Sequence, residues 1–236
     1  MKGLFITFEG TEGSGKSTQI ALLAEKLQSL GFTVRRLREP GGTPIGEEIR
    51  HTLKHSEANH AMTSEAELLL MNASRAQLVR ETIRPLLDTG AIVLCDRFYD
   101  STTAYQGYGR ELDLEKVANI VGFAVGETRP DLTLLLLVPI EVSEARRKSR
   151  QAVLLEVPPK ILEKPVASLH FGERIRDRME EADRSFFERV EKGYHEIAQA
   201  EPKRVRKIDA TQSPEKVTSE IWKLVAPLLS QVQPVQ

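Results

Sequence analysis

A glycine-rich segment ending in lysine and serine occupies residues 10–17, with the sequence Gly-Thr-Glu-Gly-Ser-Gly-Lys-Ser. This spacing matches the Gly-x-x-x-x-Gly-Lys-Ser/Thr pattern of phosphate-binding loops. In such loops, backbone N–H groups at a helix N-terminus face the phosphates, the lysine reaches the outer phosphates, and the hydroxyl binds Mg²⁺. A tight turn with a chance lysine is the alternative. We expect a nucleoside triphosphate site made by Gly10, Gly13, Ser14, Gly15, Lys16, Ser17 and Thr18, with Ser17 as a Mg²⁺ ligand.

Two further charged segments follow predicted strands. Asp96-Arg97 comes directly after the apolar run 91–95, and Arg38-Glu39-Pro40 closes an earlier run. Arg97 can bind a phosphate with a bidentate fork, which a lysine cannot imitate. Asp96 can hold the arginine or a water of Mg²⁺, so we place it in the metal site. The alternative is a structural ion pair at the end of a strand.

Glu12 places a carboxylate inside the predicted phosphate loop. Like-charge repulsion disfavours this position unless the carboxylate accepts a hydrogen bond from a substrate hydroxyl or holds the waters of a cation. We interpret Glu12 as functional, with a solvent-facing loop residue as the alternative.

A basic, proline-punctuated segment lies late in the chain. Between Arg146 and Arg178 there are nine Lys or Arg residues and four Asp or Glu residues. This composition suggests a lid over residues 146–178 that closes on the triphosphate, excludes water and stabilises charge on the transferring group. Arg150 is our candidate for that charge stabilisation and Arg146 for triphosphate binding. A solvated loop is the competing interpretation.

Strands and helices alternate along the sequence, which predicts right-handed βαβ crossovers and a parallel sheet covered on both faces. Ligands bind such sheets beyond the carboxyl ends of the strands, where the charged segments fall. A capping box of Thr63 or Ser64 with Glu67 is expected at the third helix. Strands are predicted at 4–8, 32–38, 91–95, 132–138 and 204–208, and helices after the glycine loop to residue 30 and at 45–53, 64–87, 101–107, 114–125, 142–150, 175–200 and 214–229. The fold class is therefore α/β, with a five-stranded parallel sheet of the P-loop NTPase type and a lid segment.

Composition narrows the class of protein. The 236 residues carry a net charge of −1, with 28% charged and 40% hydrophobic residues, as expected for one globular domain over 1–230 and a disordered tail over 231–236. Near-neutral charge gives no reason to expect nucleic acid or a membrane surface as a partner. No apolar run approaches the roughly 20 residues of a membrane helix, and no signal-peptide pattern is present. The single cysteine, Cys95, fits a reducing cytoplasm and lies in an apolar run, as a small core residue would.

A phosphate-binding loop alone leaves the activity open, because GTPases, motor ATPases and small-molecule kinases share it. The chain lacks the Asn-Lys-x-Asp signature of guanine binding and the strongly basic surface of a helicase module. Its other polar and cationic residues suit a second, smaller anionic substrate.

Several segments together resemble the bacterial thymidylate kinase family. The resemblance covers nearly the whole chain in the correct order, and the Arg-Glu-Pro-Gly-Gly and Ala-Tyr-Gln-Gly elements are more specific than the glycine loop. The segments are 10–18, 38–43, 74–77, 96–110, 129–133 and 208–211.

The resemblance implies phosphoryl transfer from ATP to dTMP with Mg²⁺, in an enzyme that is usually a homodimer. It implies that Arg97 and Arg75 grip the dTMP phosphate and the nearby base edge, and that Glu12 receives the sugar 3′-hydroxyl. Thr102 and Gln106 would face the thymine ring, Tyr105 would pack against the deoxyribose, and Glu39 and Pro40 would shape the monophosphate pocket. Glu180 would assist at the base of the lid.

Two departures from the family pattern stand out. Met71 occupies the position where the family commonly stacks a phenylalanine on thymine, which predicts weaker stacking or an aromatic supplied from elsewhere. The segment 151–172 is longer than the family's lid. Two rivals remain: a kinase of another nucleotide or deoxynucleoside, and a switch or assembly protein that binds or hydrolyses nucleotide.

Overall fold

The computed structural model describes residues 3–146, 149 and 183–232. Within them, five strands form one parallel sheet in the order β2-β3-β1-β4-β5. The predicted five-stranded parallel α/β sheet is confirmed. The strands are β1 (Leu4–Glu9), β2 (Val34–Arg38), β3 (Ile92–Asp96), β4 (Leu132–Leu137) and β5 (Val205–Asp209).

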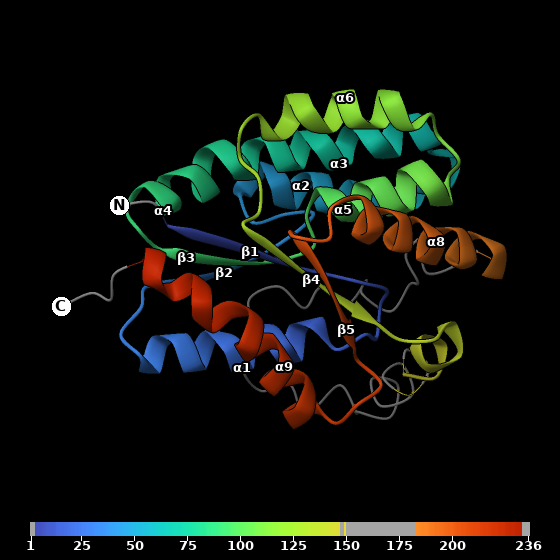
Figure 1. The fold of residues 1–236 in the computed structure, drawn as a ribbon. Coiled ribbons are helices and arrows are strands. Elements are labelled where there is room, and N and C mark those ends of the chain that lie inside the picture. Colours follow the sequence, from blue (N-terminus) through green and yellow to red (C-terminus); the bar gives the residue numbers. More distant parts are fainter. Residues whose placement is uncertain (1–2, 147–148, 150–182, 233–236) are drawn as a thin grey trace, which may run out of the picture.

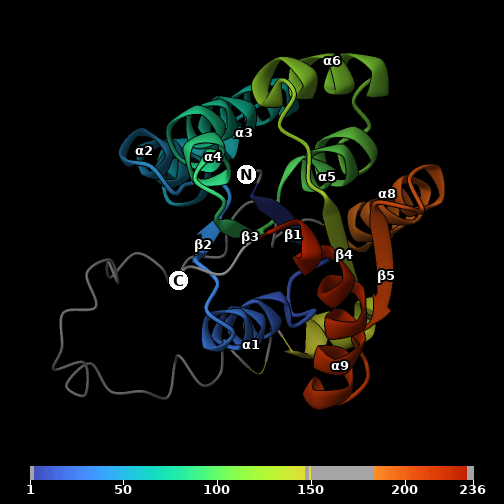
Figure 2. The ribbon, with the colours of Figure 1, turned by 60° about the vertical axis from the view of Figure 1, so that its left-hand side comes forward.

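Helices surround the sheet on both faces (Figures 1 and 2). Helices α1 and α9 cover one face, whereas α3, α5, α6 and α8 cover the other. The helices are α1 (Lys16–Ser29), α2 (Pro44–Lys54), α3 (Ser64–Leu78), α4 (Arg84–Asp88), α5 (Tyr99–Thr102), α6 (Leu114–Val125), α8 (Arg184–Ala200) and α9 (Pro214–Val225). Short 3₁₀ or π segments cover Glu57–Ala61, Val79–Ile83, Thr103–Gly109 and Ala226–Gln231, and residues 140–146 are also helical.

The core follows the alternation of side chains along the strands. In β1, Leu4, Ile6 and Phe8 pack toward α1 and α9, whereas Phe5 packs toward α3 and α6. All six residues of β1 are buried, as expected for a central strand covered on both faces. Cys95 is fully buried in the second cluster, which confirms its prediction as a small core residue.

Three predictions about elements need correction. The helix expected from residue 175 begins at Arg184, because the Asp183 carboxylate caps it by accepting a hydrogen bond from the Phe186 N–H at 2.8 Å; residues 175–182 lie outside the described part. The helix expected over 64–87 contains the π segment Val79–Ile83 just before Pro85, whose ring nitrogen has no N–H to donate. Thr63 caps α3 as predicted, but the Glu67 carboxylate takes no part in a capping box and is buried against Gln106 and Arg110.

The predicted tail also starts too early. Gln231 ends a 3₁₀ segment. Val232 is buried because its apolar side chain packs in the core cluster that α1 and α9 cover. Residues 233–236 lie outside the described part of the chain, as does most of the predicted lid. None of the described helices is long and apolar enough to cross a membrane.

Candidate active site

The glycine loop joins β1 to α1 at the carboxyl edge of the sheet. Gly10, Gly13 and Gly15 have φ angles of 130°, 77° and 92°, which L side chains rarely adopt. A Cβ atom at Gly10 would lie 2.2 Å from the carbonyl oxygen of Leu136 on β4, so the position admits only glycine. The N-cap residue of α1 is Gly15, which has no side chain to cap the helix, and the first turn carries no acidic residue. The loop and the helix N-terminus therefore offer an anion site.

Lys16 is folded onto this loop. Its ammonium group donates to the carbonyl oxygens of Gly10 at 3.0 Å and Thr11 at 2.9 Å. Burial, followed by the charge of Arg97, lowers the pKa of Lys16 to about 7. An anion placed between Lys16 and Arg97 would offset the repulsion between these two cations and favour the charged lysine.

One cavity of about 260 Å³ lies between the loop and the residues predicted to bind a second substrate. The structure thus brings the two predicted groups together, although their segments are up to 94 positions apart. Fifteen predicted residues line it: Glu12, Gly13, Gly15, Lys16, Ser17, Thr18, Glu39, Pro40, Met71, Arg75, Asp96, Arg97, Thr102, Tyr105 and Gln106.

Ser17 and Asp96 meet at this cavity. The Ser17 hydroxyl donates to the Asp96 carboxylate at 3.2 Å, across the gap between α1 and the end of β3. A hydroxyl beside a single carboxylate suits Mg²⁺, which keeps several waters and takes its remaining ligands from phosphates. Among the described residues, no group of three His, Cys, Asp or Glu side chains could hold a metal ion without such help.

Arg97 is held in a constrained conformation at the end of β3. Its φ angle is 68°, which is uncommon for a residue other than glycine. Its guanidinium donates to the Ser101 hydroxyl at 3.1 Å and to the Tyr194 and Tyr105 hydroxyls at 3.4 Å. These contacts use three of the five N–H groups of an arginine, so two remain for a ligand within the described surroundings.

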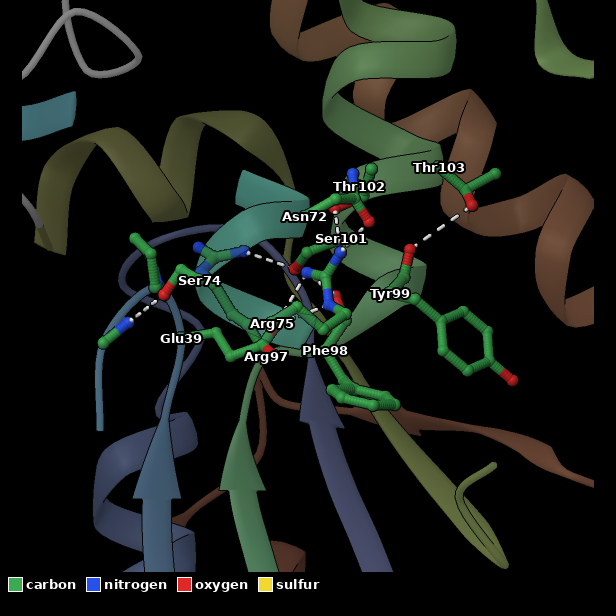
Figure 3. A network of polar contacts seen from close by, with 12 residues as sticks. Glu39, Asn72, Ser74, Arg75, Arg97, Phe98, Tyr99, Ser101, Thr102 and Thr103 are labelled. Atoms are coloured by element: carbon green, nitrogen blue, oxygen red, sulfur yellow. Dashed lines mark hydrogen bonds and ion pairs between the residues drawn. The ribbon is translucent and has the colours of Figure 1, made fainter. Parts of the chain in front are cut away.

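Arg75 has a different arrangement, which Figure 3 shows. Its guanidinium donates twice to Glu39 Oε2, at 2.9 and 2.6 Å. Its other three N–H groups donate to the Asn72 side chain, the Thr102 hydroxyl and the Phe98 carbonyl oxygen. All five donors are therefore occupied in this structure, where Arg75 joins α3, the segment after β2, and α5. That Arg75 grips the dTMP phosphate and the nearby base edge stays a prediction.

Burial raises the pKa of Glu39, and the neighbouring Arg75 opposes this rise. Within the described part of the chain, the second carboxylate oxygen of Glu39 is buried without a hydrogen-bond partner. Glu39 thus depends on Arg75 for its stability as an anion.

Glu9, at the end of β1, supports the site through hydrogen bonds to residues around Arg97. It was not predicted from the sequence. Its buried carboxylate accepts hydrogen bonds from the Phe98 N–H at 2.7 Å, the Ser101 hydroxyl at 2.5 Å and the Tyr194 hydroxyl at 3.1 Å. Burial, followed by the charge of Asp100, raises the pKa of Glu9 to about 7. Two of these donors, Ser101 and Tyr194, are the ones that contact Arg97.

The remaining predicted residues lie around the cavity or beyond it. Arg146 does not line the cavity; its guanidinium donates to the carbonyl oxygens of Gly13 and Ala210 and so joins the glycine loop to the segment after β5. Gly10 and Ser14 do not line the cavity either, but the Lys16 ammonium donates to the Gly10 carbonyl oxygen and the Ser14 hydroxyl. Arg150 and Glu180 lie outside the described residues.

Five lining residues were not predicted: Arg38, Arg50, Lys54, Ser101 and Phe187. Arg50 and Lys54 are four residues apart on α2, a spacing that places two cations on one helix face and could have been noticed. Phe187 comes from α8, at the far end of the sequence, so no local pattern indicates its place. It brings an aromatic ring to the cavity that also contains Met71.

The sheet order, the glycine loop and the polar cavity opposite it define a P-loop nucleotide-binding protein with room for a second ligand. A family model described as thymidylate kinase matches residues 8–221. The chain therefore belongs to the thymidylate kinase family, as the sequence motifs predicted.

Individual relatives agree with this assignment. A thymidylate kinase of Thermomicrobium roseum is 43% identical over 225 residues, covering 95% of each chain. One of Syntrophotalea carbinolica is 44% identical over 218 residues, covering 92% of this chain and 93% of the relative. The crystal structure of thymidylate kinase from Ehrlichia chaffeensis is similar with a TM-score of 0.69 and 30% identity, covering 95% of this chain and 99% of that one.

Proposed function

We propose that this chain transfers the γ-phosphoryl group of ATP to the phosphate of dTMP, giving dTDP and ADP. The observation that carries the proposal is the single cavity lined by both the glycine loop and Arg97. A cavity that presents both Lys16 and Arg97 can hold a donor and an acceptor phosphate next to each other. Family membership supports dTMP as the acceptor.

The donor side consists of main-chain N–H groups and Lys16. On ATP binding, the Lys16 ammonium exchanges the carbonyl oxygens of Gly10 and Thr11 for phosphate oxygens. The added negative charge keeps the lysine protonated at neutral pH despite its burial. Bound Mg²⁺ would neutralise charge on the phosphates, and Ser17 and Asp96 are the residues that would hold it.

On the acceptor side, the free donors of Arg97 bind the dTMP phosphate and orient one of its oxygens toward the γ-phosphorus. This oxygen forms the new bond as the bond to the bridging oxygen of ADP breaks. Thr102 and Gln106 face the base, Tyr105 packs on the deoxyribose, and Glu12 accepts the 3′-hydroxyl. Positioning and charge stabilisation supply most of the rate enhancement in such transfers.

A substrate panel tests the proposal. Purified protein with ATP and Mg²⁺ is assayed for ADP release with dTMP, dUMP, dCMP, dAMP, dGMP or thymidine. The expected result is the highest kcat/KM for dTMP and little ADP release without an acceptor. Preference for another acceptor, or ADP release that dTMP does not stimulate, would reject the proposal and favour one of the two rivals.

The assembly proposed is a homodimer that works in the cytoplasm. Its support is the exposed apolar side chains on the neighbouring helices α3 and α6, where Leu69 is 56% exposed and Phe123 is 84% exposed. Light scattering should give twice the mass of one chain, and Phe123→Glu should shift the protein toward the monomer. A monomeric wild-type protein at micromolar concentration would reject this assembly.

A further inference from the structure

The amide of Gln106 has a definite orientation. Its nitrogen donates at 2.9 Å to the Glu67 carboxylate, which is 2% exposed. A carboxylate can only accept hydrogen bonds, so the Gln106 nitrogen must face Glu67. Gln106 is also buried and lines the cavity, and its amide oxygen accepts no hydrogen bond from the described residues. The amide therefore presents an acceptor to the cavity.

Glu67 is itself held in place. Arg110 donates to both of its carboxylate oxygens, at 3.2 and 3.0 Å, and the Arg110 guanidinium lies over the ring of Phe186. Both oxygens of the Glu67 carboxylate accept hydrogen bonds from Arg110, so Glu67 meets the Gln106 amide as an acceptor. The orientation of the amide is thus set from outside the cavity.

A parallel arrangement acts on Thr102, one helical turn before Gln106. Its hydroxyl oxygen accepts from Arg75 at 2.8 Å, which leaves the hydroxyl hydrogen to point elsewhere. Thr102 and Gln106 both line the cavity. Together they offer a donor and an acceptor, four residues apart along the helical turns that follow β3.

We infer that Glu67 is a positioning residue for base specificity, which fixes the Gln106 amide so that its oxygen, and not its nitrogen, meets the base. This inference rests on the proposed function. Thymine presents a carbonyl oxygen beside an N–H group, which complements a donor beside an acceptor. Cytosine presents an amino group beside an unprotonated ring nitrogen, so its ring nitrogen would face the Gln106 oxygen as a second acceptor. Glu67 thereby selects a pyrimidinedione without touching it.

The test is Glu67→Gln, which keeps the shape of the side chain but supplies both a donor and an acceptor. The Gln106 amide can then turn over and present its nitrogen. We expect the ratio of kcat/KM for dTMP to that for dCMP to fall at least about tenfold, through KM rather than kcat, with the KM for ATP unchanged. Glu65→Gln, an exposed position on the same helix, is the matched control and should leave the ratio unaltered.

Two double variants separate positioning from general structural support. Exchanging the pair, as Glu67→Gln with Gln106→Glu, keeps the hydrogen bond and returns an acceptor-only group to the cavity, so it should restore the preference for dTMP to within about threefold of wild type. In a Gln106→Leu background, Glu67→Gln should produce no further change in the ratio.

The double variant with the exchanged pair tests the positioning role of Glu67 even if Glu67→Gln alone fails to fold. Any one of four results would overturn the inference. The first two are an unaltered ratio in Glu67→Gln and an equal loss of kcat/KM for both nucleotides. The others are additive effects in the Gln106→Leu background and no restoration of the preference in the exchanged pair. Failure of the proposed function is distinct, because wild-type protein would then show no dTMP-dependent ADP release.

Discussion

The two walls of the cavity are built in different ways. The donor wall is a continuous stretch of backbone between β1 and α1, in which glycine conformations and one lysine carry the chemistry. The acceptor wall is made of side chains from α2, α3, α5, the π segment Thr103–Gly109, α8 and the segments that close β2 and β3. Many of its donors and acceptors are hydrogen-bonded to one another without a ligand, as in Arg75 with Glu39 and Gln106 with Glu67.

This difference has a physical consequence. A backbone loop can bind the phosphates of any nucleoside triphosphate, because its N–H groups read charge and not base identity. A wall of buried side chains presents a fixed pattern of donors and acceptors, and a wrong ligand leaves a buried group unpaired. Under the proposed function, the donor wall therefore holds ATP, whereas the acceptor wall orients the dTMP phosphate through Arg97 and selects the base.

The largest expected effect is on the donor wall. Lys16→Ala should lower kcat by about 10³-fold, because a buried cation that stabilises the transferring phosphoryl group is lost. The affinity for dTMP, measured by calorimetry, should change by less than about threefold, since the acceptor wall is intact. Lys26→Ala, on the same helix but packed on Trp222, is the control. Near-normal turnover in Lys16→Ala would remove this residue from the mechanism.

The next effect is on the stability of the acceptor wall. Arg75→Ala leaves the buried Glu39 carboxylate without its cation and should lower the free energy of unfolding by about 3–5 kcal/mol in urea titrations. Adding Glu39→Gln should recover a large part of this loss. The exposed pair of Arg184 and Glu141 offers the contrast, since Arg184→Ala should leave the free energy of unfolding nearly unchanged. Equal losses in the two arginine variants would contradict the account.

Glu9 predicts a pH dependence. Because folding raises its pKa from 4.5 to about 7, the folded state takes up a proton, and this contribution to stability is full below pH 4.5 and is lost as the pH rises to 7. Glu9→Gln does not titrate. The difference in unfolding free energy between wild type and Glu9→Gln should therefore shift by about 3 kcal/mol across this window, in favour of wild type at the acid end. Parallel pH profiles would show that the Glu9 pKa is ordinary.

The smallest effect concerns Met71. Met71→Phe should keep or improve the affinity for dTMP, by at most about tenfold, because an aromatic ring stacks on a base better than a thioether does. Calorimetry with dTMP alone measures this. A large loss of affinity would show that Met71 does not lie against the base.

The donor wall and the sheet could be predicted from sequence because each depends on residues close together in the chain. The apolar run around β4 and the glycine spacing indicate their structure locally. The acceptor wall could be predicted only in part. The local pattern predicts that Glu67 caps a helix, but its hydrogen-bond partner Gln106 is 39 positions away. The hydrogen bond between Glu9 and Tyr194 spans 185 positions. Such pairings arise from tertiary packing and have no periodic signal.

The most direct test follows the phosphoryl group itself. Wild-type protein is mixed with ATP labelled in its γ-phosphate, Mg²⁺ and unlabelled dTMP, and the products are separated by ion-exchange chromatography. The account predicts that the label appears in dTDP, and only when dTMP is present, since the two phosphate sites share one cavity. Label that appears only in inorganic phosphate, or that stays in ATP, would contradict it.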